Sequence, residues 1–177
     1  RRLGYWVAAS LVLNAFWILS IQFDLLPLSV PIIVVLLAVL IQTFRQTIQY
    51  RPTGTLDAVI TDGSIGLYLG WVCVATAANA TALLVASGFT GWGLAPELWS
   101  VVVIVVAAAA GVLLAVVGAG RIAPALSLAW GLAWVAVGRL AGEPASAVTG
   151  FVAIAAVVVV LLVAIGIRLS RGKALAA

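Results

Sequence analysis

GLYLGWVCVATAANATALL, residues 66–84, is the stretch that decides the fold of this chain. It predicts a membrane-spanning helix, because about 20 apolar residues that rise ~1.5 Å each cross the ~30 Å hydrocarbon core of a bilayer. At about 100° per residue, one side of this helix is aromatic and amide-bearing; it carries Tyr68, Trp71, Ala75, Asn79 and Ala82. The other side is small enough for a neighbouring backbone to approach; it carries Gly66, Gly70, Cys73, Ala77 and Ala80. We expect a central helix that packs on one side and lines something on the other.

The composition extends this interpretation to the whole chain. Of its 177 residues, 66% are hydrophobic and 8% are charged, whereas soluble domains average about 25% charged residues. The chain is therefore predicted to be an all-α, polytopic transmembrane bundle. Six apolar segments are expected to span the membrane, at residues 3–22, 27–48, 65–88, 96–118, 122–141 and 145–168. In the polar stretch 45–64, turns are expected at RPTGTLD, residues 51–57, and TDGS, residues 61–64.

The positive charges support this count of helices. If the six segments alternate in direction, Arg139 lies on one side of the membrane and all other cations lie opposite, namely Arg1, Arg2, Arg45, Arg51, Arg121, Arg168, Arg171 and Lys173. Cytoplasmic loops are enriched in lysine and arginine, so Arg1 and Ala177 are both predicted to face the cytoplasm. Because the cations sit at helix ends rather than in one cluster, nucleic acid is not expected as a partner.

Several classes of chemistry lack their usual residues. The chain has no histidine and one cysteine, and its five carboxylates lie near predicted helix ends. We therefore predict no intrachain disulfide, no metal site and no enzymatic activity, and the placement of the acids argues against an ion-coupled pump. The chain also has no methionine, so we expect it to begin inside a longer protein or to have been processed.

Two further patterns concern packing and polar groups in the membrane. Ala107, Gly111 and Ala115 form a small-residue face that predicts close helix packing. On the first helix, Trp6, Ser10, Asn14 and Trp17 fall within roughly 80° of one another. An amide at membrane depth is costly unless it is hydrogen-bonded. Asn14 and Asn79 either bond to neighbouring helices as structural links, or face a ligand cavity beside Trp17 and Trp71.

Two motifs resemble those of the TspO/MBR family, the translocator or tryptophan-rich sensory proteins. GLYLGWVCVATAAN, residues 66–79, is similar to the family pattern P-Y-L-x-W-V-x-x-A-x-x-x-N, with Leu67 in place of the proline. LNAFW, residues 13–17, is similar to Leu-Asn-x-x-Trp in an earlier family helix. The resemblance implies that residues 1–88 hold the last three helices of a TspO-like core and that residues 89–177 add three transmembrane helices to the same bundle, as in a longer bacterial branch.

The resemblance also implies a function. The family is associated with binding porphyrins, haem-related tetrapyrroles and sterols between its helices, and with regulation or transport. We therefore expect a receptor or carrier in the bacterial cytoplasmic (inner) membrane that binds a flat apolar ligand such as a porphyrin without histidine ligation. The implied ligand-binding residues are Asn14, Trp17, Tyr68, Trp71, Ala75 and Asn79. The alternative is a structural or accessory subunit that packs against partner membrane proteins or further copies of itself.

Overall fold

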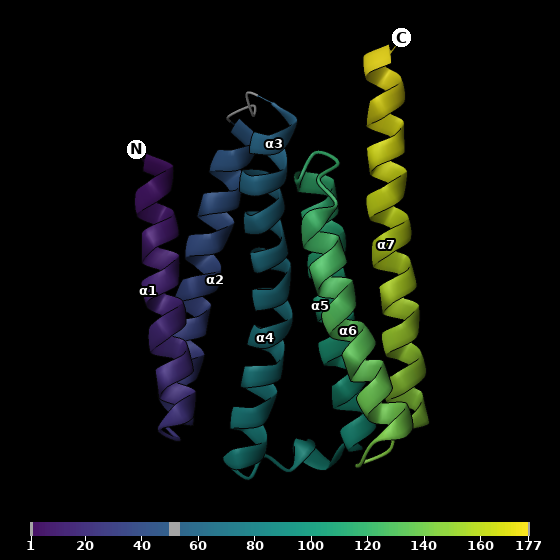
Figure 1. Cartoon of the computed structure of the whole chain (residues 1–177). Helices are drawn as coiled ribbons and strands as arrows, with labels where there is room; N and C mark the ends of the chain where they lie inside the picture. The colour runs from purple at the N-terminus through teal and green to yellow at the C-terminus, as the bar shows by residue number, and fades with distance from the viewer. Residues whose placement is uncertain (1, 50–53, 177) are drawn as a thin grey trace. The chain divides into compact units, whose positions relative to one another are not determined.

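The computed structural model of the protein describes residues 2–49 and 54–176. Within these ranges it consists of helices joined by short turns, and it has no strand (Figure 1). Among the described residues, six helical stretches are long and apolar enough to cross a membrane: Leu3–Gln22, Leu26–Gln49, Thr55–Ala86, Pro96–Val117, Ala123–Ala141 and Ala147–Arg171. The predicted all-α fold with six transmembrane helices is therefore confirmed.

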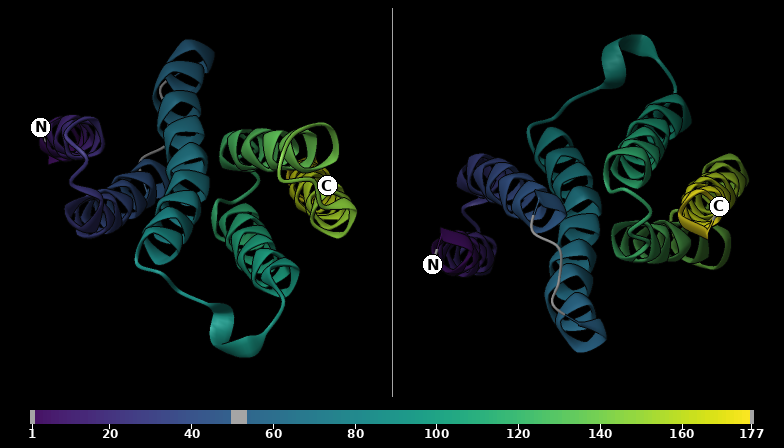
Figure 2. Two further views of the ribbon diagram at one scale, coloured as in Figure 1. Left: turned by 90° about the horizontal axis from the view of Figure 1, so that it is seen from below. Right: turned by 90° about the horizontal axis from the view of Figure 1, so that it is seen from above.

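The chain divides into two compact units, Arg1–Phe89 and Thr90–Ala177. The first unit contains α1 (Arg2–Gln22), α2 (Leu26–Gln49), α3 (Thr55–Asp57), a π-helix η1 (Ala58–Gly63) and α4 (Ser64–Ala86). The second contains a short 3₁₀ turn η2 (Gly91–Gly93), α5 (Pro96–Val117), α6 (Ala123–Ala141) and α7 (Ala147–Ala176). The end-on views of Figure 2 show the three long helices of each unit as a group.

Helix α2 is the centre of the first unit, because it contacts both α1 and α4. Its buried residues recur every three or four positions, as expected of a helix with one buried face; they are Ser29, Ile33, Leu36, Leu40, Thr43, Phe44 and Thr47. The hydroxyls on this face bond to carbonyls of their own helix: Thr43 donates to Val39 at 2.7 Å and Thr47 to Phe44 at 2.8 Å. These bonds let polar residues lie on a buried face of an apolar helix.

The third span differs from the sequence-based expectation. The turn predicted at residues 61–64 is wrong, because the chain is helical from Thr55 through the π-helix into α4. A π turn closes a wider ring than an α turn and occurs mostly as a single turn inside an otherwise α-helical stretch, as it does here. The Thr61 hydroxyl donates to the Asp57 carboxylate across this segment at 2.9 Å. Of the other predicted turn, Thr55–Asp57 is helical and residues 51–53 lie outside the described residues.

In the second unit, α5, α6 and α7 all contact one another. The predicted small-residue face of α5 is buried here, with Ala107, Gly111 and Ala115 among its buried residues. A Cβ atom on Gly111 would lie 3.1 Å from Leu128 Cδ2 and from both Val160 methyl groups. Gly111 therefore lets α6 and α7 approach the α5 backbone more closely than a larger residue would allow.

Helix α7 is longer than predicted, since it runs to Ala176 instead of ending near residue 168. The added residues, LSRGKALA, are mostly strong helix formers. The predicted segment ended where the run of hydrophobic residues ends. The residues that follow favour helix, so the backbone stays helical beyond residue 168. This extension places Arg168 and Arg171 on a continuous helix.

Replacing Gly111 with leucine is expected to destabilise the second unit. Overpacking of this kind costs about 1–3 kcal/mol, and we expect a loss of that size in the free energy of unfolding measured by SDS titration in detergent micelles. Gly138→Leu is the matched control, because a Cβ atom on Gly138 meets nothing within 4 Å. Equal losses in the two variants would contradict the close packing at Gly111.

Candidate functional site

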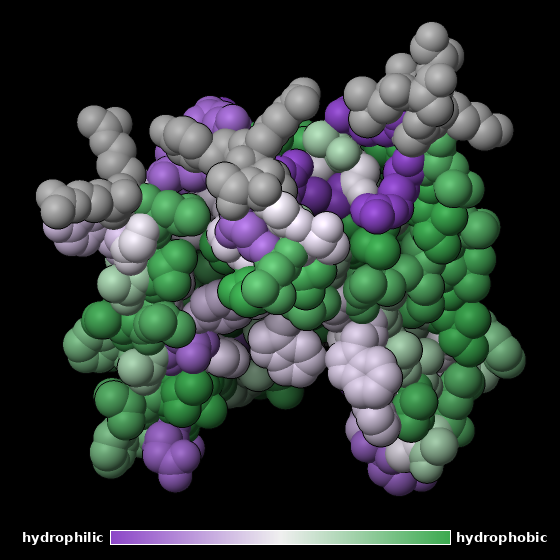
Figure 3. Space-filling model, turned by 45° about the horizontal axis from the view of Figure 1, so that its top comes forward, coloured by the Kyte–Doolittle hydropathy of each residue, from purple (hydrophilic) through white to green (hydrophobic). Residues whose placement is uncertain are grey.

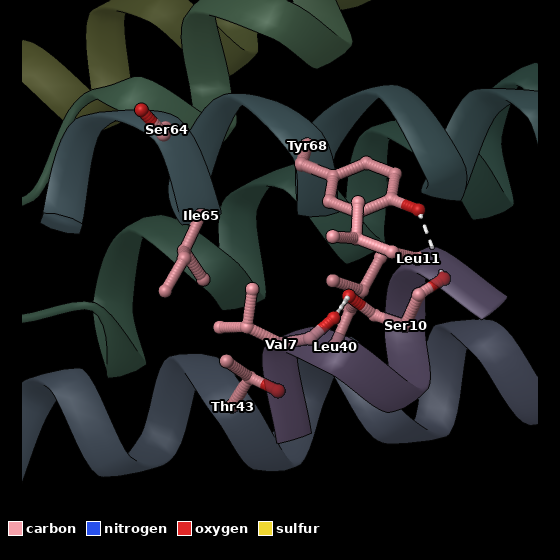
Figure 4. A pocket seen from close by; sticks show the side chains of 8 residues that line it. All are labelled: Val7, Ser10, Leu11, Leu40, Thr43, Ser64, Ile65 and Tyr68. Carbon is pink, nitrogen blue, oxygen red and sulfur yellow. Dashed lines mark hydrogen bonds between the residues drawn. The ribbon is translucent and has the colours of Figure 1, made fainter. Parts of the chain in front are cut away.

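A partly open groove of about 190 Å³ lies in the first unit between α1, α2 and α4. Each helix contributes part of the wall (Figure 4), and the lining residues are Val7, Ser10, Leu11, Leu40, Thr43, Ser64, Ile65 and Tyr68. Ser10 and Leu11 lie three and four residues after Val7 on α1, about one turn further along, so one side of that helix meets the groove. Leu40 and Thr43 lie on the buried face of α2 and form the floor.

The wall of the groove is almost wholly apolar, although it contains serine and threonine. The physical reason is that their hydroxyls bond to their own helices. Ser10 Oγ donates to the Val7 carbonyl at 2.8 Å, and Thr43 Oγ1 donates to the Val39 carbonyl at 2.7 Å. Each hydroxyl proton is therefore hydrogen-bonded within its own helix, and the side chain presents mainly carbon atoms to the groove.

Tyr68 is the residue that links the two outer walls of the groove. Its hydroxyl donates to the Ser10 carbonyl at 3.3 Å, across from α4 to α1 (Figure 4). A bond of this length is weak, and the carbonyl that accepts it already belongs to the hydrogen-bonded backbone of α1. The contact can therefore break at low cost and free a phenolic donor for a ligand in the groove.

Asn79, another predicted site residue, has a structural contact instead of a place in the groove. Its side chain is buried, and Asn79 Nδ2 donates to Ser29 Oγ at 2.9 Å. Ser29 Oγ in turn lies 2.7 Å from the Leu26 carbonyl, to which it can donate. This chain of bonds joins α4 to α2 and corresponds to the structural-link alternative for Asn79.

The two predicted residues on α1 have different surroundings. Trp17 Nε1 is buried and has no hydrogen-bond partner among the described residues. Asn14 is half-buried one turn earlier, and its amide makes no hydrogen bond within the described part of the chain. An indole N–H that is buried without an acceptor is uncommon, because losing its contact with water is not compensated. Trp17 is therefore a donor that a ligand acceptor would satisfy.

Trp71 and Ala75 complete the predicted set on α4. Trp71 is 48% exposed, and Ala75 is half-buried. Of the six predicted residues, the groove thus contains Tyr68 alone. The helical wheel correctly placed Tyr68, Trp71, Ala75 and Asn79 on one side of α4, but that side meets α2 at Asn79, meets α1 at Tyr68 and is open at Trp71.

The contribution of α2 was missed by the sequence-based reasoning, which treated residues 27–48 as a plain span. Ser29, Leu40 and Thr43 all belong to its buried face. The signal was present in the sequence, because polar residues recur at helical spacing in an otherwise apolar segment, at Ser29, Thr43 and Thr47.

The described residues contain no candidate metal site. No three histidine, cysteine or acidic side chains among them are grouped closely enough to hold an ion.

The comparisons with known proteins give one match. A family model described as "TSPO-like protein" matches residues 1–167. This match covers most of the chain and runs through both compact units. No curated protein and no solved structure matches the chain.

The Asn79–Ser29 contact generates a prediction about stability. Each of Asn79→Ala and Ser29→Ala is expected to destabilise the protein, and the double variant should lose less than the sum, because either substitution alone removes the shared hydrogen bond. Coupling energies of such bonds in membrane proteins average about 0.6 kcal/mol and reach about 1.7 kcal/mol. The measurement is a double-mutant cycle of unfolding free energies in detergent. Strict additivity would show that the two side chains do not interact.

Proposed function

Because the chain belongs to the TSPO-like family of membrane proteins, we propose that it is a receptor or carrier for a flat apolar ligand such as a porphyrin. The ligand binds at the groove between α1, α2 and α4. The observation that carries this proposal is the chemistry of the groove: its wall is almost wholly apolar, with one phenolic hydroxyl at its edge. Small-molecule sites commonly combine an apolar wall with few orienting polar groups.

The size of the groove limits how such a ligand would bind. Sites that enclose a drug-sized molecule measure roughly 300–1,000 Å³, whereas this groove measures about 190 Å³. It therefore takes one edge of a macrocycle, and the remainder lies outside it against exposed apolar side chains. Leu11, which lines the groove and is 59% exposed, is placed for that contact.

Two tryptophans support the binding of a flat ring with polar substituents. Trp17 lies seven residues after Ser10, and so about 10 Å further along nearly the same side of α1. Its buried indole N–H has no acceptor among the residues that the structure describes, and a carbonyl or carboxylate of the ligand would supply one. Trp71 lies close to Tyr68 on α4 and presents an exposed indole on which a flat ring can stack. The chain has no histidine, so a haem-like ligand would be held without histidine ligation.

The remaining features of the proposal follow from the family and the topology. The role is one of binding and transfer, without catalysis. The protein resides in the bacterial inner membrane with Arg1 and Ala177 on the cytoplasmic side, as the distribution of cations predicts. A ligand of this kind partitions into lipid, so it would reach the partly open groove from the bilayer.

The groove is tested by a pair of matched substitutions on α1. Val7→Phe places a phenyl ring in the groove. Val12→Phe adds the same group at a residue that is 55% exposed and does not line the groove. We expect Val7→Phe to weaken protoporphyrin binding at least about ten-fold, which corresponds to ~1.4 kcal/mol, and Val12→Phe to leave it within about two-fold. Binding is measured by titrating protoporphyrin into detergent-solubilised protein and following tryptophan fluorescence. Equal affinities in the two variants would remove the groove from the proposal.

The tryptophans are tested by the same titration. Quenching of the protein fluorescence should fall strongly in the Trp17→Phe plus Trp71→Phe variant, whereas Trp130→Phe plus Trp134→Phe in the second unit should keep it. Unchanged quenching in the first variant would count against these two residues. If wild-type protein shows no porphyrin binding at all and co-purifies with a membrane protein in mild detergent, the accessory-subunit alternative takes the place of the receptor.

A further inference from the structure

Three arginines of the second unit lie at one end of its helices, whereas Arg139 lies at the other end, near Glu143. Arg121 follows the C-terminal end of α5, and Arg168 and Arg171 lie in the last part of α7. The acidic side chains in residues 90–177 are Glu97 and Glu143, which lie beside the start of α5 and the end of α6. Since α5 has 22 residues and rises ~1.5 Å per residue, these carboxylates are roughly 30 Å from Arg121, Arg168 and Arg171 along the helix axis.

The arginines gather over one turn of the backbone, which joins α5 to α6. Ala119 and Gly120 both have positive φ there, 56° and 85°. The turn lies directly against α7, because a Cβ atom on Gly120 would be 3.4 Å from Arg168 Cα and 3.7 Å from Arg171 Cδ. Arg168 Nη1 lies 3.3 Å from the Gly120 carbonyl, and Arg121 Nη1 lies 3.5 Å from the Gly118 carbonyl. Three guanidinium-bearing side chains thus converge on Gly118–Arg121.

The hydrogen-bonding capacity of two of these groups exceeds what the turn uses. Arg168 makes one long bond, to Gly120, and Arg171 makes none within the part of the chain that the structure describes. A guanidinium presents several N–H donors in a fixed fork that matches the oxygens of a phosphate or carboxylate. Neighbouring like charges also repel one another, and an anion between them removes that repulsion.

The surface next to the arginines is apolar. Ile165 lies one turn before Arg168 on α7 and is 49% exposed, and Leu161 lies one further turn before it and is half-buried. In Figure 3, hydrophilic residues border the hydrophobic flank at the right of the view. A ligand that fits both surfaces has an anionic head and a hydrocarbon tail, which is the chemistry of an anionic phospholipid.

We propose that the α5–α6 turn and the end of α7 form a binding site for the phosphate-bearing headgroup of an anionic phospholipid. Arg168 and Arg171 hold the phosphate, and the acyl chains lie along the flank of α7 that carries Leu161 and Ile165. Basic pockets at the ends of transmembrane helices are suited to such headgroups. A lipid fits better than free inorganic phosphate because the basic group and the apolar flank adjoin each other. The site lies entirely in the second unit, so it is independent of the groove in the first.

The test measures lipid binding to the purified full chain by native mass spectrometry, with phosphatidylglycerol titrated against phosphatidylcholine. An arginine near an anionic surface contributes about 1 kcal/mol, which is about five-fold in affinity. We therefore expect the wild-type protein to bind phosphatidylglycerol more tightly than phosphatidylcholine. Relative to wild type, the affinity for phosphatidylglycerol should fall about five-fold in Arg168→Gln and about thirty-fold in Arg168→Gln plus Arg171→Gln.

Two controls separate a built site from general charge attraction. Arg45→Gln removes an exposed cation from α2, on the same predicted side of the membrane, and should change binding less than about two-fold. Arg168→Lys plus Arg171→Lys keeps the charge and should recover most of the binding; if the double glutamine variant does not fold, the two single glutamine variants decide the test. Equal phosphatidylglycerol affinity in wild type and the arginine-to-glutamine variants, or an equal loss in Arg45→Gln, would overturn the proposal. Competition by inorganic phosphate at the same concentration as the lipid would assign the site to a free anion and overturn the lipid.

Discussion

The hydrocarbon core of a bilayer offers no hydrogen-bond partner, so each polar group inside the spans must find one within the protein. The structure meets this requirement in two ways. Ser10, Thr43 and Thr76 bond to carbonyls of their own helices at 2.7–2.8 Å. Asn79, whose amide has more bonding capacity than one helix can satisfy, reaches Ser29 on α2. The same constraint makes the walls of the groove apolar, and it makes the indole N–H of Trp17, which has no partner within the described part of the chain, an exception.

The sequence was sufficient to predict the spans, because their length and apolar character follow directly from the thickness of the membrane. It failed between Thr55 and Ser64, where glycine, aspartate and threonine are typical of a turn and a π-helix continues the backbone instead. The amino-acid composition of a segment indicates whether it can form a turn. Whether a turn forms depends also on how the segment packs against neighbouring helices. The extent of α7 beyond residue 168 was missed for a related reason, since the end of hydrophobicity is not the end of a helix.

The candidate site was only partly predictable. Helical periodicity identifies which residues share a face of α4, but it does not say which helix that face meets. Tyr68 reaches α1 and Asn79 reaches α2, although both lie on the same side of α4. Periodicity from one helix could not assign these partners, and the contribution of α2 became clear only from its packing. The division into a family core at residues 1–88 and additional helices stays a prediction, because the family match runs through both units.

The π-helix before α4 has a consequence for how this region can vary. A π turn accommodates one residue more than an α turn, and such bulges are frequent at functional sites. Removing one residue between 58 and 63 would convert the segment to ordinary α-helix and leave the membrane-embedded face of α4 unchanged. The residues upstream, including Asp57, would keep roughly their present direction around the axis, because the wider turn had absorbed the extra residue. The Ala58–Gly63 segment can therefore take up a change of one residue in chain length without turning either the polar approach or the span.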